Sequence, residues 1–387
     1  MQKTDWNSLS DEAFRAEVRT FFETEFPEYL RFPAHHLRWA EVKDWYGTLF
    51  RKGWAAPAWP VEWGGMGLTP AKQLIFMEEQ ERHGVARTPD MGIVMLGPLL
   101  IQYGSMPLRQ LFLPPTLRGD FIWCQGYSEP GAGSDLAALR TEAILEGDHY
   151  RINGSKIWTS YATDATHMFM LARTEKGVKK QDGISFLLVD MKSPGITVRP
   201  IRNIGGSTTF AEVFFDDVRT PADWLVGERN QGWSIAKSLL GFERLSIGSP
   251  RLAQAGLKRL DDVLAERGGA ISAQYADRVA RLRLDVADLA SLYEKFAAAV
   301  RRGERLGADV SVLKVFATDL FQRLSELSIE VAGSAGGITG RTQFREEGSR
   351  VDVLSLFYNA RPPTIYGGSN EIQRNIIAKS LLNLPMG

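Results

Sequence analysis

The sequence is poor in the residues that form disulfides, metal sites and strongly charged surfaces. Its 387 residues contain one cysteine, Cys124, which excludes an internal disulfide and a zinc site built from thiolates. The five histidines show no metal-binding spacing such as HExxH, so we predict no metal site. Lysine plus arginine and aspartate plus glutamate both total 46, so no net charge favours binding to nucleic acid or to an anionic membrane.

Long hydrophobic runs are also missing. The longest apolar stretch, MGIVMLGPLLIQYG, is too short to span a bilayer and is interrupted by glycine and proline. The first residues, MQKTDWNSLSDEAF, are polar and contain no signal-peptide core. We therefore expect a globular cytoplasmic protein without a membrane span, long enough for two or three packed units.

Three regions of the chain follow different hydrophobic patterns. Residues 1–120 have helical periodicity, and Thr69 with Pro70 is a typical helix start. Residues 121–228 contain short segments rich in β-branched and aromatic residues, such as THMFMLART and GISFLLVDM, which predict an antiparallel β-domain. Residues 229–387 return to long apolar stripes typical of a helix bundle. The pattern therefore predicts an α+β protein.

Two segments of the β-region have the chemistry of a binding site. The glycine-rich stretch YSEPGAGSDLAALR, residues 127–140, can present backbone N–H groups to an anion or a ring edge, although its pattern is also that of a plain turn. It is neither a Walker A sequence nor a GxGxxG motif. In NGSKIWTSYA, Trp158 offers a stacking surface beside Thr159 and Ser160, although a tryptophan in a β-domain is usually part of the core.

Two features of the C-terminal region also point to a site. On a helix, Glu243 shares a face with apolar residues, which raises a carboxyl pKa and suits a general base, whereas a structural ion pair is the alternative. In PTIYGGSNEIQRNIIAK, the adjacent glycines Gly367 and Gly368 allow a close approach of backbone or ligand. Ser369 is a candidate helix cap, and Glu371 suits the positive end of the helix dipole.

Taken in order, these motifs resemble the acyl-CoA dehydrogenase family over essentially the whole chain. The matching segments are YSEPGAGSD, INGSKIWTS, the spaced Phe215, Val218 and Pro221, the pair Glu243–Arg244, and IYGGSNEIQRNIIAK. The resemblance implies a helical N-terminal domain (1–120), a central antiparallel β-barrel domain (121–228) and a C-terminal four-helix bundle (229–387).

The resemblance also implies a bound FAD and an acyl-CoA thioester as substrate. The implied reaction is α,β-dehydrogenation to the trans-2-enoyl-CoA: a carboxylate removes the α-proton, and hydride passes from the β-carbon to the flavin N5 atom. An electron-transfer flavoprotein is the implied electron acceptor. The positions that match the family's flavin-binding segments are Gln125, Tyr127, Ser128, Gly133, Ser134, Trp158, Thr159, Ser160, Ser369 and Glu371.

Individual roles follow from the same resemblance. Ser128 would bind the flavin pyrimidine edge, and Ser160 takes the position of the hydroxyl that binds N5. Ser369 and Glu371 match the helix start that holds the ADP part of FAD. The residues implied to contact substrate are Ser134, Arg244 at the CoA entrance, Gly367 and Gly368.

The first departure from the family pattern concerns the catalytic base. Many members carry the base as a glutamate in the terminal motif, where this chain has Gly367. A branch of the family instead places it immediately before the arginine of the earlier helix, and this chain has Glu243 there. We therefore predict that Glu243 is the base and that Gly367 leaves room for its carboxylate.

The second departure concerns assembly. Members usually carry Arg-x-x-Phe-Gly and Gln-x-x-Gly-Gly segments that reach a neighbouring subunit's FAD. Here Arg267 lacks the following Phe-Gly, and Gly333 stands where glutamine is expected, although Gly336 and Gly337 remain. We expect a homo- or hetero-tetramer, and the changed segments indicate an α2β2 tetramer with a paralogous subunit, as in bacterial enzymes of steroid side-chain degradation.

Three alternatives remain open from the sequence. The chain could be a flavin-poor scaffolding subunit of a heteromeric acyl-CoA dehydrogenase, for which the changed interface segments speak. It could also be a family member with changed chemistry, such as an oxidase or a desulfinase. Desulfinases lack the base, so Glu243 argues against that class.

Overall fold

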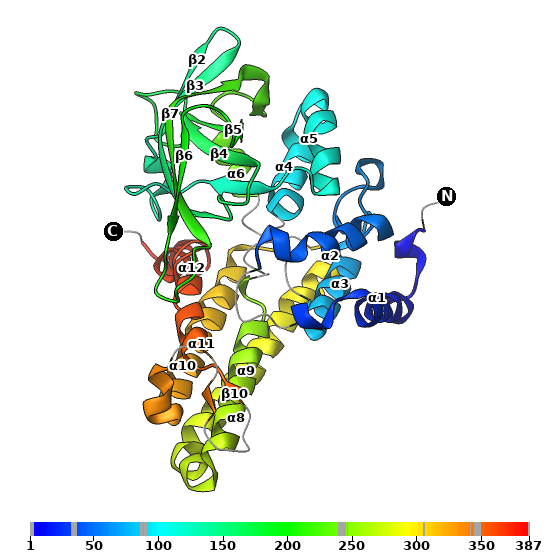
Figure 1. The fold of residues 1–387 in the computed structure, drawn as a ribbon, viewed down its shortest axis with the longest axis vertical. Coiled ribbons are helices and arrows are strands. Elements are labelled where there is room, and N and C mark those ends of the chain that lie inside the picture. Colours follow the sequence, from blue (N-terminus) through cyan, green and yellow to red (C-terminus); the bar gives the residue numbers. More distant parts are fainter. Residues whose placement is uncertain are drawn as a thin grey trace. The chain divides into compact units, whose positions relative to one another are not determined.

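The structure is a computed structural model that describes residues 4–31, 37–85, 88, 91–238, 245, 247–304, 306–338, 340, 342–343 and 350–385. The chain divides into two compact units, Met1–Leu239 and Leu240–Gly387 (Figure 1). The first unit joins a group of helices to a sheet, and the second unit is mainly helical. The expected sequence of helices, strands and helices is thus confirmed.

The first unit begins with helices that start where the sequence places capping residues. The Ser10 hydroxyl accepts a hydrogen bond from Ala13 N at 3.1 Å, and the Thr69 hydroxyl accepts one from Lys72 N at 3.4 Å. These bonds satisfy free amides of the first turn. The helices of this unit are α1 (Asp11–Glu25), α2 (Trp39–Lys52), α3 (Pro70–Arg82), α4 (Gly97–Tyr103), α5 (Met106–Arg118) and α6 (Gly232–Ser238).

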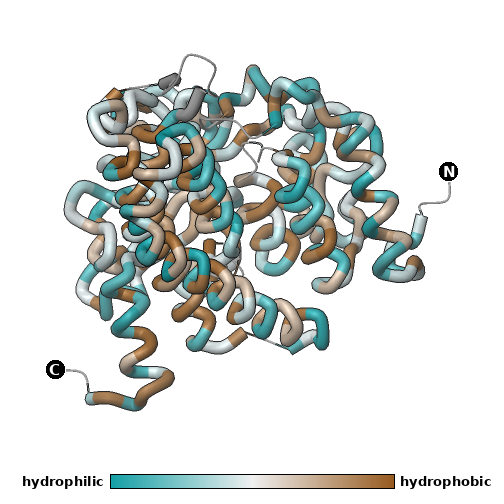
Figure 2. Tube along the Cα trace, turned by 90° about the horizontal axis from the view of Figure 1, so that it is seen from below, coloured by the Kyte–Doolittle hydropathy of each residue, from teal (hydrophilic) through white to brown (hydrophobic). Residues whose placement is uncertain are grey.

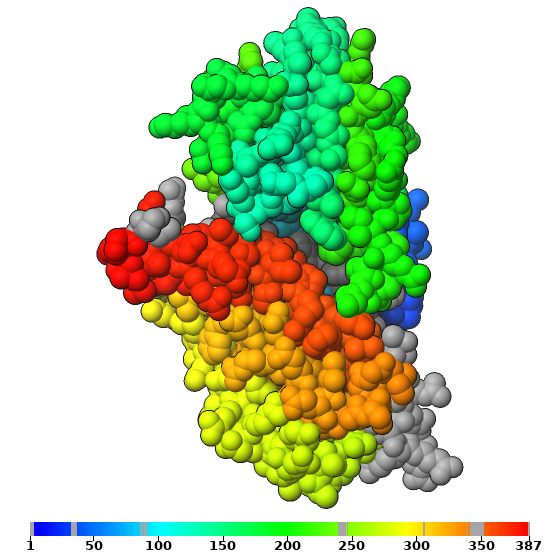
Figure 3. Space-filling model, turned by 90° about the vertical axis from the view of Figure 1, so that its left-hand side faces the viewer, coloured from blue at the N-terminus to red at the C-terminus, as the bar shows by residue number. Residues whose placement is uncertain are grey.

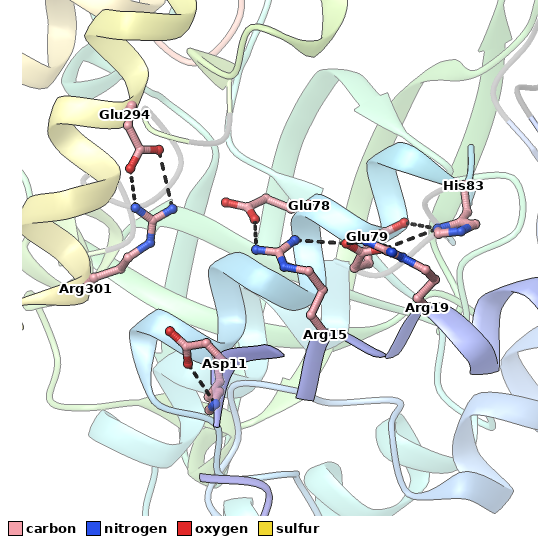
Figure 4. A network of polar contacts seen from close by, with 9 residues as sticks. Asp11, Arg15, Arg19, Glu78, Glu79, His83, Glu294 and Arg301 are labelled. Carbon is pink, nitrogen blue, oxygen red and sulfur yellow. Dashed lines mark hydrogen bonds and ion pairs between the residues drawn. The ribbon is translucent and has the colours of Figure 1, made fainter. Parts of the chain in front are cut away.

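A buried carboxylate joins α1 to α3. The Glu79 side chain is 1% exposed and accepts hydrogen bonds from Arg15 Nη1 at 2.9 Å and from Arg19 Nε at 3.1 Å (Figure 4). Burial alone would raise the pKa of Glu79, but Arg19 and Arg15 bring this pKa below its usual value. Glu78, on the same turn, pairs with Arg15 at 2.6 Å and is more exposed.

The strands of the first unit form one mostly antiparallel sheet. They are β1 (Trp123–Gly126), β2 (Glu142–Glu146), β3 (His149–Ser160), β4 (His167–Arg173), β5 (Ile184–Asp190), β6 (Ile196–Ile201), β7 (Phe210–Pro221) and β8 (Leu225–Val226). Their order is β6-β7-β3-β2-β4-β5-β8, and β1 pairs in parallel with β4. The region predicted to be a β-barrel domain therefore forms one sheet, in which β6 and β8 are the two end strands of the hydrogen-bonded order.

The paired strands β4 and β5 are apolar along almost their whole length because both faces are covered. Phe169 and Phe186 face a core that also contains the buried aromatic residues of α1, α2, α3 and α5, and their rings are stacked at 5.8 Å. Met168 and Leu187 face a second core, built from residues of the sheet and from Ala162 in the turn after β3. This arrangement explains the continuous hydrophobic runs of these strands.

The second unit is a helix bundle built around α10 (Ser311–Ala332). This helix packs against α8 (Arg251–Arg267), α9 (Gly269–Arg301) and α12 (Asn370–Ser380). In the space-filling view α12, in red, runs along the surface of the unit (Figure 3). The remaining elements are α11 (Leu354–Asn359) and a hairpin of β9 (Thr342–Gln343) and β10 (Arg350–Val351).

Hydropathy along the helices agrees with this packing. Hydrophilic and hydrophobic residues alternate along them (Figure 2), as expected for helices that bury one face. The predicted domain limits at 120/121 and 228/229 stay predictions, because the helices of residues 11–118 and the sheet share one compact unit. Within the described ranges, no helix is long and apolar enough to cross a membrane.

We predict that Glu79→Gln destabilises the first unit by about 1–3 kcal/mol, because the bonds from Arg15 and Arg19 lose their charged acceptor. The effect is measured as a loss in the free energy of unfolding by urea. Since the folded-state pKa of Glu79 is lowered, its contribution is present above the ordinary value of 4.5 and is lost as the pH falls. The difference between the two proteins should therefore shrink in acid.

Glu78→Gln is the matched control, because it changes a more exposed carboxylate on the same helical turn. It should cost less than about 1 kcal/mol. Equal losses for the two variants would contradict the special role of Glu79.

Candidate functional site

The glycine-rich loop of residues 127–140 is closed by the carboxylate of Glu129. Its Oε2 atom accepts a hydrogen bond from Arg140 N at 2.6 Å, and Oε1 accepts one from Thr141 N at 2.9 Å. The backbone of Glu129 also exchanges two hydrogen bonds with Ala132, each 3.0 Å long. One buried side chain therefore ties the beginning of this segment to its end.

A buried lysine holds this loop against β3. Lys156 is 0% exposed, and its Nζ donates to Glu129 Oε1 at 2.8 Å and to the carbonyl oxygen of Tyr127 at 3.1 Å. Burial lowers the pKa of Lys156 to about 8, although Glu129 opposes this shift. Burial alone would raise the pKa of Glu129, but Lys156, the Thr141 side chain and the Arg140 amide bring it below its usual value.

The loop and the end of β3 meet at Ser128. Its carbonyl oxygen accepts a hydrogen bond from Ile157 N at 2.9 Å. At this point the pairing of β3 with β7 shifts in register between Lys156 and Thr159. The bulge places Trp158 in the left-handed region with φ of 60°. The structure thus brings Ser128 next to the predicted Trp158–Ser160 segment.

Trp158 displays its ring instead of burying it. The residue is 57% exposed, and the ring meets that of Phe210 edge to face at 6.1 Å. The alternative that this tryptophan belongs to the core is wrong. A large apolar ring held outward by a bulge, at a backbone angle uncommon for a side chain of this size, is an available stacking surface.

The two residues after Trp158 differ in their surroundings. Thr159 is buried, and its Oγ1 has no hydrogen-bond partner within the described part of the chain. Such an unsatisfied buried hydroxyl is unusual and fits a site whose bound group supplies the partner. Ser160 is half-buried and closes β3 by pairing with Phe210.

The other predicted positions of the first unit surround this centre at different depths. Gln125 lies in β1 and is half-buried, and the ring of Tyr127 packs edge to face against Phe169 and Phe186. Gly133 and Ser134 are exposed at the tip of the loop. A Cβ atom added at Gly133 would meet nothing within 4 Å, so local packing does not require this glycine.

In the second unit, the double glycine forms the entry to α12. Gly367 has φ of 64° and Gly368 has φ of 77°, both in the left-handed region that favours glycine. The Ser369 hydroxyl then accepts a hydrogen bond from Ile372 N at 3.4 Å, which confirms the predicted helix cap. Glu371 lies in the first turn, where its own backbone amide and the Ser369 hydroxyl lower its pKa.

The predicted base and its neighbour, Glu243 and Arg244, lie outside the described residues. Arg267 ends α8, and its Nη2 lies 3.5 Å from the place that a Cβ atom would take at Gly333. Gly333 has φ of 61° and ψ of −134°, a conformation that only glycine adopts readily. The backbone at Gly333 therefore disfavours any side chain, including the glutamine that the family pattern has at this position.

Sequence reasoning missed Glu129 and Lys156, although both lie in segments it singled out. The signal for Lys156 is strand alternation, because Tyr150, Ile152 and Lys156 are all buried residues of β3 at even spacing. A lysine on the buried face of a strand requires a partner. No group of three or more potential metal ligands occurs in the described part of the chain.

Family models match the chain in three consecutive parts. They are described as the acyl-CoA dehydrogenase N-terminal domain (residues 8–120), middle domain (residues 124–218) and C-terminal domain (residues 230–382). The acyl-CoA dehydrogenase IpdE1 of Mycobacterium tuberculosis is 38% identical over 97% of this chain and 98% of that protein. The short-chain specific mitochondrial acyl-CoA dehydrogenase of Homo sapiens is 33% identical over 94% of this chain and 88% of that protein.

Solved structures give the same result for the fold. The Tcur3481-Tcur3483 steroid ACAD has a TM-score of 0.85 at 29% identity, covering 97% of this chain and 98% of that one. The ChsE4-ChsE5 complex from Mycobacterium tuberculosis has a TM-score of 0.78 at 31% identity, covering 98% and 99%. The similarity therefore extends over both compact units.

We predict that Lys156→Met destabilises the first unit by about 3–5 kcal/mol, because Glu129 is left as a buried charge without its counter-ion. The double variant Lys156→Met/Glu129→Gln should recover part of this loss, because no buried charge remains and the amide oxygen still accepts one of the two hydrogen bonds from the loop. Free energies of unfolding by urea measure both effects. In the single variant the Glu129 pKa should rise above its usual range, so the loss should diminish as the pH falls.

Lys180→Met is the matched control. Lys180 pairs with Asp135 of the same loop at 2.9 Å, but both side chains are exposed. Its removal should cost less than about 1 kcal/mol. A loss as large as that of Lys156→Met would show that loop charge, and not the buried pair, determines stability.

Proposed function

Because the chain belongs to the acyl-CoA dehydrogenase family, we propose that it is an FAD-dependent enzyme that converts an acyl-CoA thioester to the trans-2-enoyl-CoA. The observation that carries the proposal is the outward ring of Trp158, held beside Ser128 by the Ile157–Ser128 hydrogen bond. A flat exposed ring next to a loop of small hydroxyls suits a flavin.

Each unit carries residues that suit one part of this cofactor. Trp158 would stack on the flat ring, and Gln125, Tyr127 and Ser128 would line its polar edge. The Thr159 hydroxyl, buried without a partner in the described structure, supports a bound group at this place. The start of α12, with Ser369 and Glu371, would hold the ADP part of FAD, since the backbone amides of a helix N-terminus favour the diphosphate anion. When bound, FAD supplies the acceptor for the hydride.

The remaining chemistry belongs to side chains of this chain. An α-proton of a thioester is only weakly acidic, so its removal needs a carboxylate whose pKa is raised toward neutrality. On the helix that the sequence predicts here, Glu243 would share a face with Leu239, Leu240 and Ile247, and such surroundings raise a carboxyl pKa. Glu243 therefore takes the α-proton, and the hydride leaves from the β-carbon.

The substrate-binding residues complete the assignment. Ser134, exposed at the loop tip, and Gly367 with Gly368, in the turn before α12, would line the acyl-thioester path. Arg244 would meet the CoA phosphates at the entrance. Because a structural neighbour is named a steroid acyl-CoA dehydrogenase, we propose a steroid-derived acyl-CoA as the first substrate to test. The electron acceptor would be a cytoplasmic electron-transfer flavoprotein.

The assembly we propose is a tetramer of this chain with a paralogous subunit. The names of both solved neighbours describe two different chains, Tcur3481-Tcur3483 and ChsE4-ChsE5. The conformation of Gly333 supports the same conclusion, because glutamine would be strained at this position. The loop with Ser128 and the outward Trp158 argue that this subunit carries flavin-binding chemistry and is not a mere scaffold.

We predict that Glu243→Gln slows the bleaching of the flavin by acyl-CoA at least about 100-fold, because the proton acceptor is lost. The enzyme is co-expressed with its paralogous subunit, and flavin absorbance is followed without oxygen over a panel of acyl-CoA thioesters. The visible spectrum of bound flavin should remain. Glu228→Gln, an exposed carboxylate nearby in the sequence, should bleach at the normal rate. Bleaching of Glu243→Gln at the rate of the unchanged enzyme would overturn the assignment.

We also predict that this chain expressed alone does not form a homotetramer with one FAD per chain. Its Gly333 and Arg267 segments lack the residues with which family members complete a neighbour's site. Native mass spectrometry and flavin absorbance give the subunit and cofactor counts for the single and the co-expressed proteins. A stable homotetramer with a full complement of FAD would refute the heteromeric assembly.

A further inference from the structure

A second fully buried lysine lies in the helical unit, beneath the double-glycine turn. Lys314 belongs to α10 and is 0% exposed. Its Nζ donates to the carbonyl oxygen of Gly368 at 2.9 Å and to Asn370 Oδ1 at 2.8 Å. Burying an ammonium group is costly, and an apolar side chain of similar size would fill this space at a lower cost. Its presence therefore requires a role beyond filling the core.

The lysine is part of a set of bonds that hold both carbonyl oxygens of the turn. Gln373 Nε2 donates to Gly367 O at 3.0 Å and to Gly368 O at 3.3 Å. Gln373 comes from the first turns of α12 and is itself buried. The turn is thus fixed from one side by α10 and from the other by the helix it precedes.

The same ammonium group also fixes the first residue of α12. Asn370 is buried, and while its Oδ1 accepts from Lys314, its Nδ2 donates to Asp319 Oδ1 at 2.7 Å. Asp319 also pairs with Arg374, one turn further along α12, at 2.9 Å. The start of α12 is therefore attached to α10 through Lys314 and Asp319 together.

The charge of Lys314 acts in the same direction as the helix dipole. A cation beneath a helix N-terminus adds to the positive potential there. The pKa of Glu371 in this first turn is lowered by its own backbone amide and by Ser369, with smaller contributions from Arg374 and Lys314. The charge of Lys314 thus makes a small contribution at the first turn of α12.

We propose that Lys314 is a positioning residue that fixes the Gly367–Gly368 turn and the N-terminus of α12, and thereby sets the affinity for the cofactor diphosphate. The inference rests on the proposed function, because that function assigns the start of α12 to the diphosphate. Lys314 would touch neither substrate nor cofactor. It acts through the backbone of Gly368 and the side chain of Asn370.

The experiment measures the dissociation constants of FAD and of riboflavin for the co-expressed complex after its flavin has been removed. Lys314→Met should weaken FAD binding by about tenfold to a hundredfold, because the variant loses hydrogen bonds from a charged donor and losses of this size are typical of such bonds. Riboflavin carries the ring but no diphosphate, so its affinity should stay within about twofold of the unchanged protein if the ring site does not depend on α12. General damage to the fold would weaken both ligands together.

Lys379→Met is the matched control, since it removes an exposed lysine from the last turn of the same helix. It should leave both affinities unchanged. If Lys314→Met fails to fold, Lys314→Gln takes its place, because it keeps a hydrogen-bond donor while losing the charge. Weaker FAD binding with unchanged riboflavin binding supports the proposal in either variant.

Two outcomes overturn the inference in different ways. If the unchanged complex binds FAD, and the Lys314 variant that folds binds it equally well or loses FAD and riboflavin in proportion, the positioning role is wrong and the proposed function stands. If the unchanged complex binds no FAD at all, the proposed function fails and the role of Lys314 fails with it.

Discussion

In each compact unit, a buried ammonium group that binds loop carbonyls is the constraint on which the candidate binding segment depends. Lys156 holds the carbonyl of Tyr127 and the carboxylate of Glu129 beneath the glycine-rich loop. Lys314 holds the carbonyl of Gly368 at the entry to α12. In each unit, a side chain from a regular element fixes a segment that has irregular backbone. Loops rich in glycine need such external support because their own conformational freedom is large.

The supported segments share a second property, which is left-handed backbone. Trp158, Gly367 and Gly368 all have positive φ; Trp158 lies at a bulge within β3, and the two glycines lie just before α12. Glycine adopts such angles freely, but for tryptophan they cost conformational energy. The surrounding hydrogen bonds must therefore hold Trp158 in place. The Ile157–Ser128 bond and the pairing of Thr159 with Ala211 enclose Trp158 on both sides. The hydrogen bonds on either side of Trp158 thus hold it in its strained backbone conformation.

The sequence predicted those features that depend on local chemistry. The caps at Thr69 and Ser369, the apolar strands β4 and β5 and the order of helices and strands were all readable, because each depends on near neighbours in the chain. The Lys156–Glu129 pair was not, because it joins residues 27 positions apart through the register of β3. The outward direction of Trp158 depends on the bulge, which alternation alone does not reveal.

The conformation of Gly367 bears on where the catalytic base belongs. With φ of 64° and a carbonyl bound by Gln373, this position is part of a turn whose two residues are both left-handed. A glutamate here would cost about 1–2 kcal/mol in backbone strain. The same turn gives Lys314 and Gln373 their acceptors, so a change of backbone at Gly367 would disturb the start of α12 as well. The turn therefore favours glycine on its own account, which supports a base supplied from elsewhere in the chain, as we propose for Glu243.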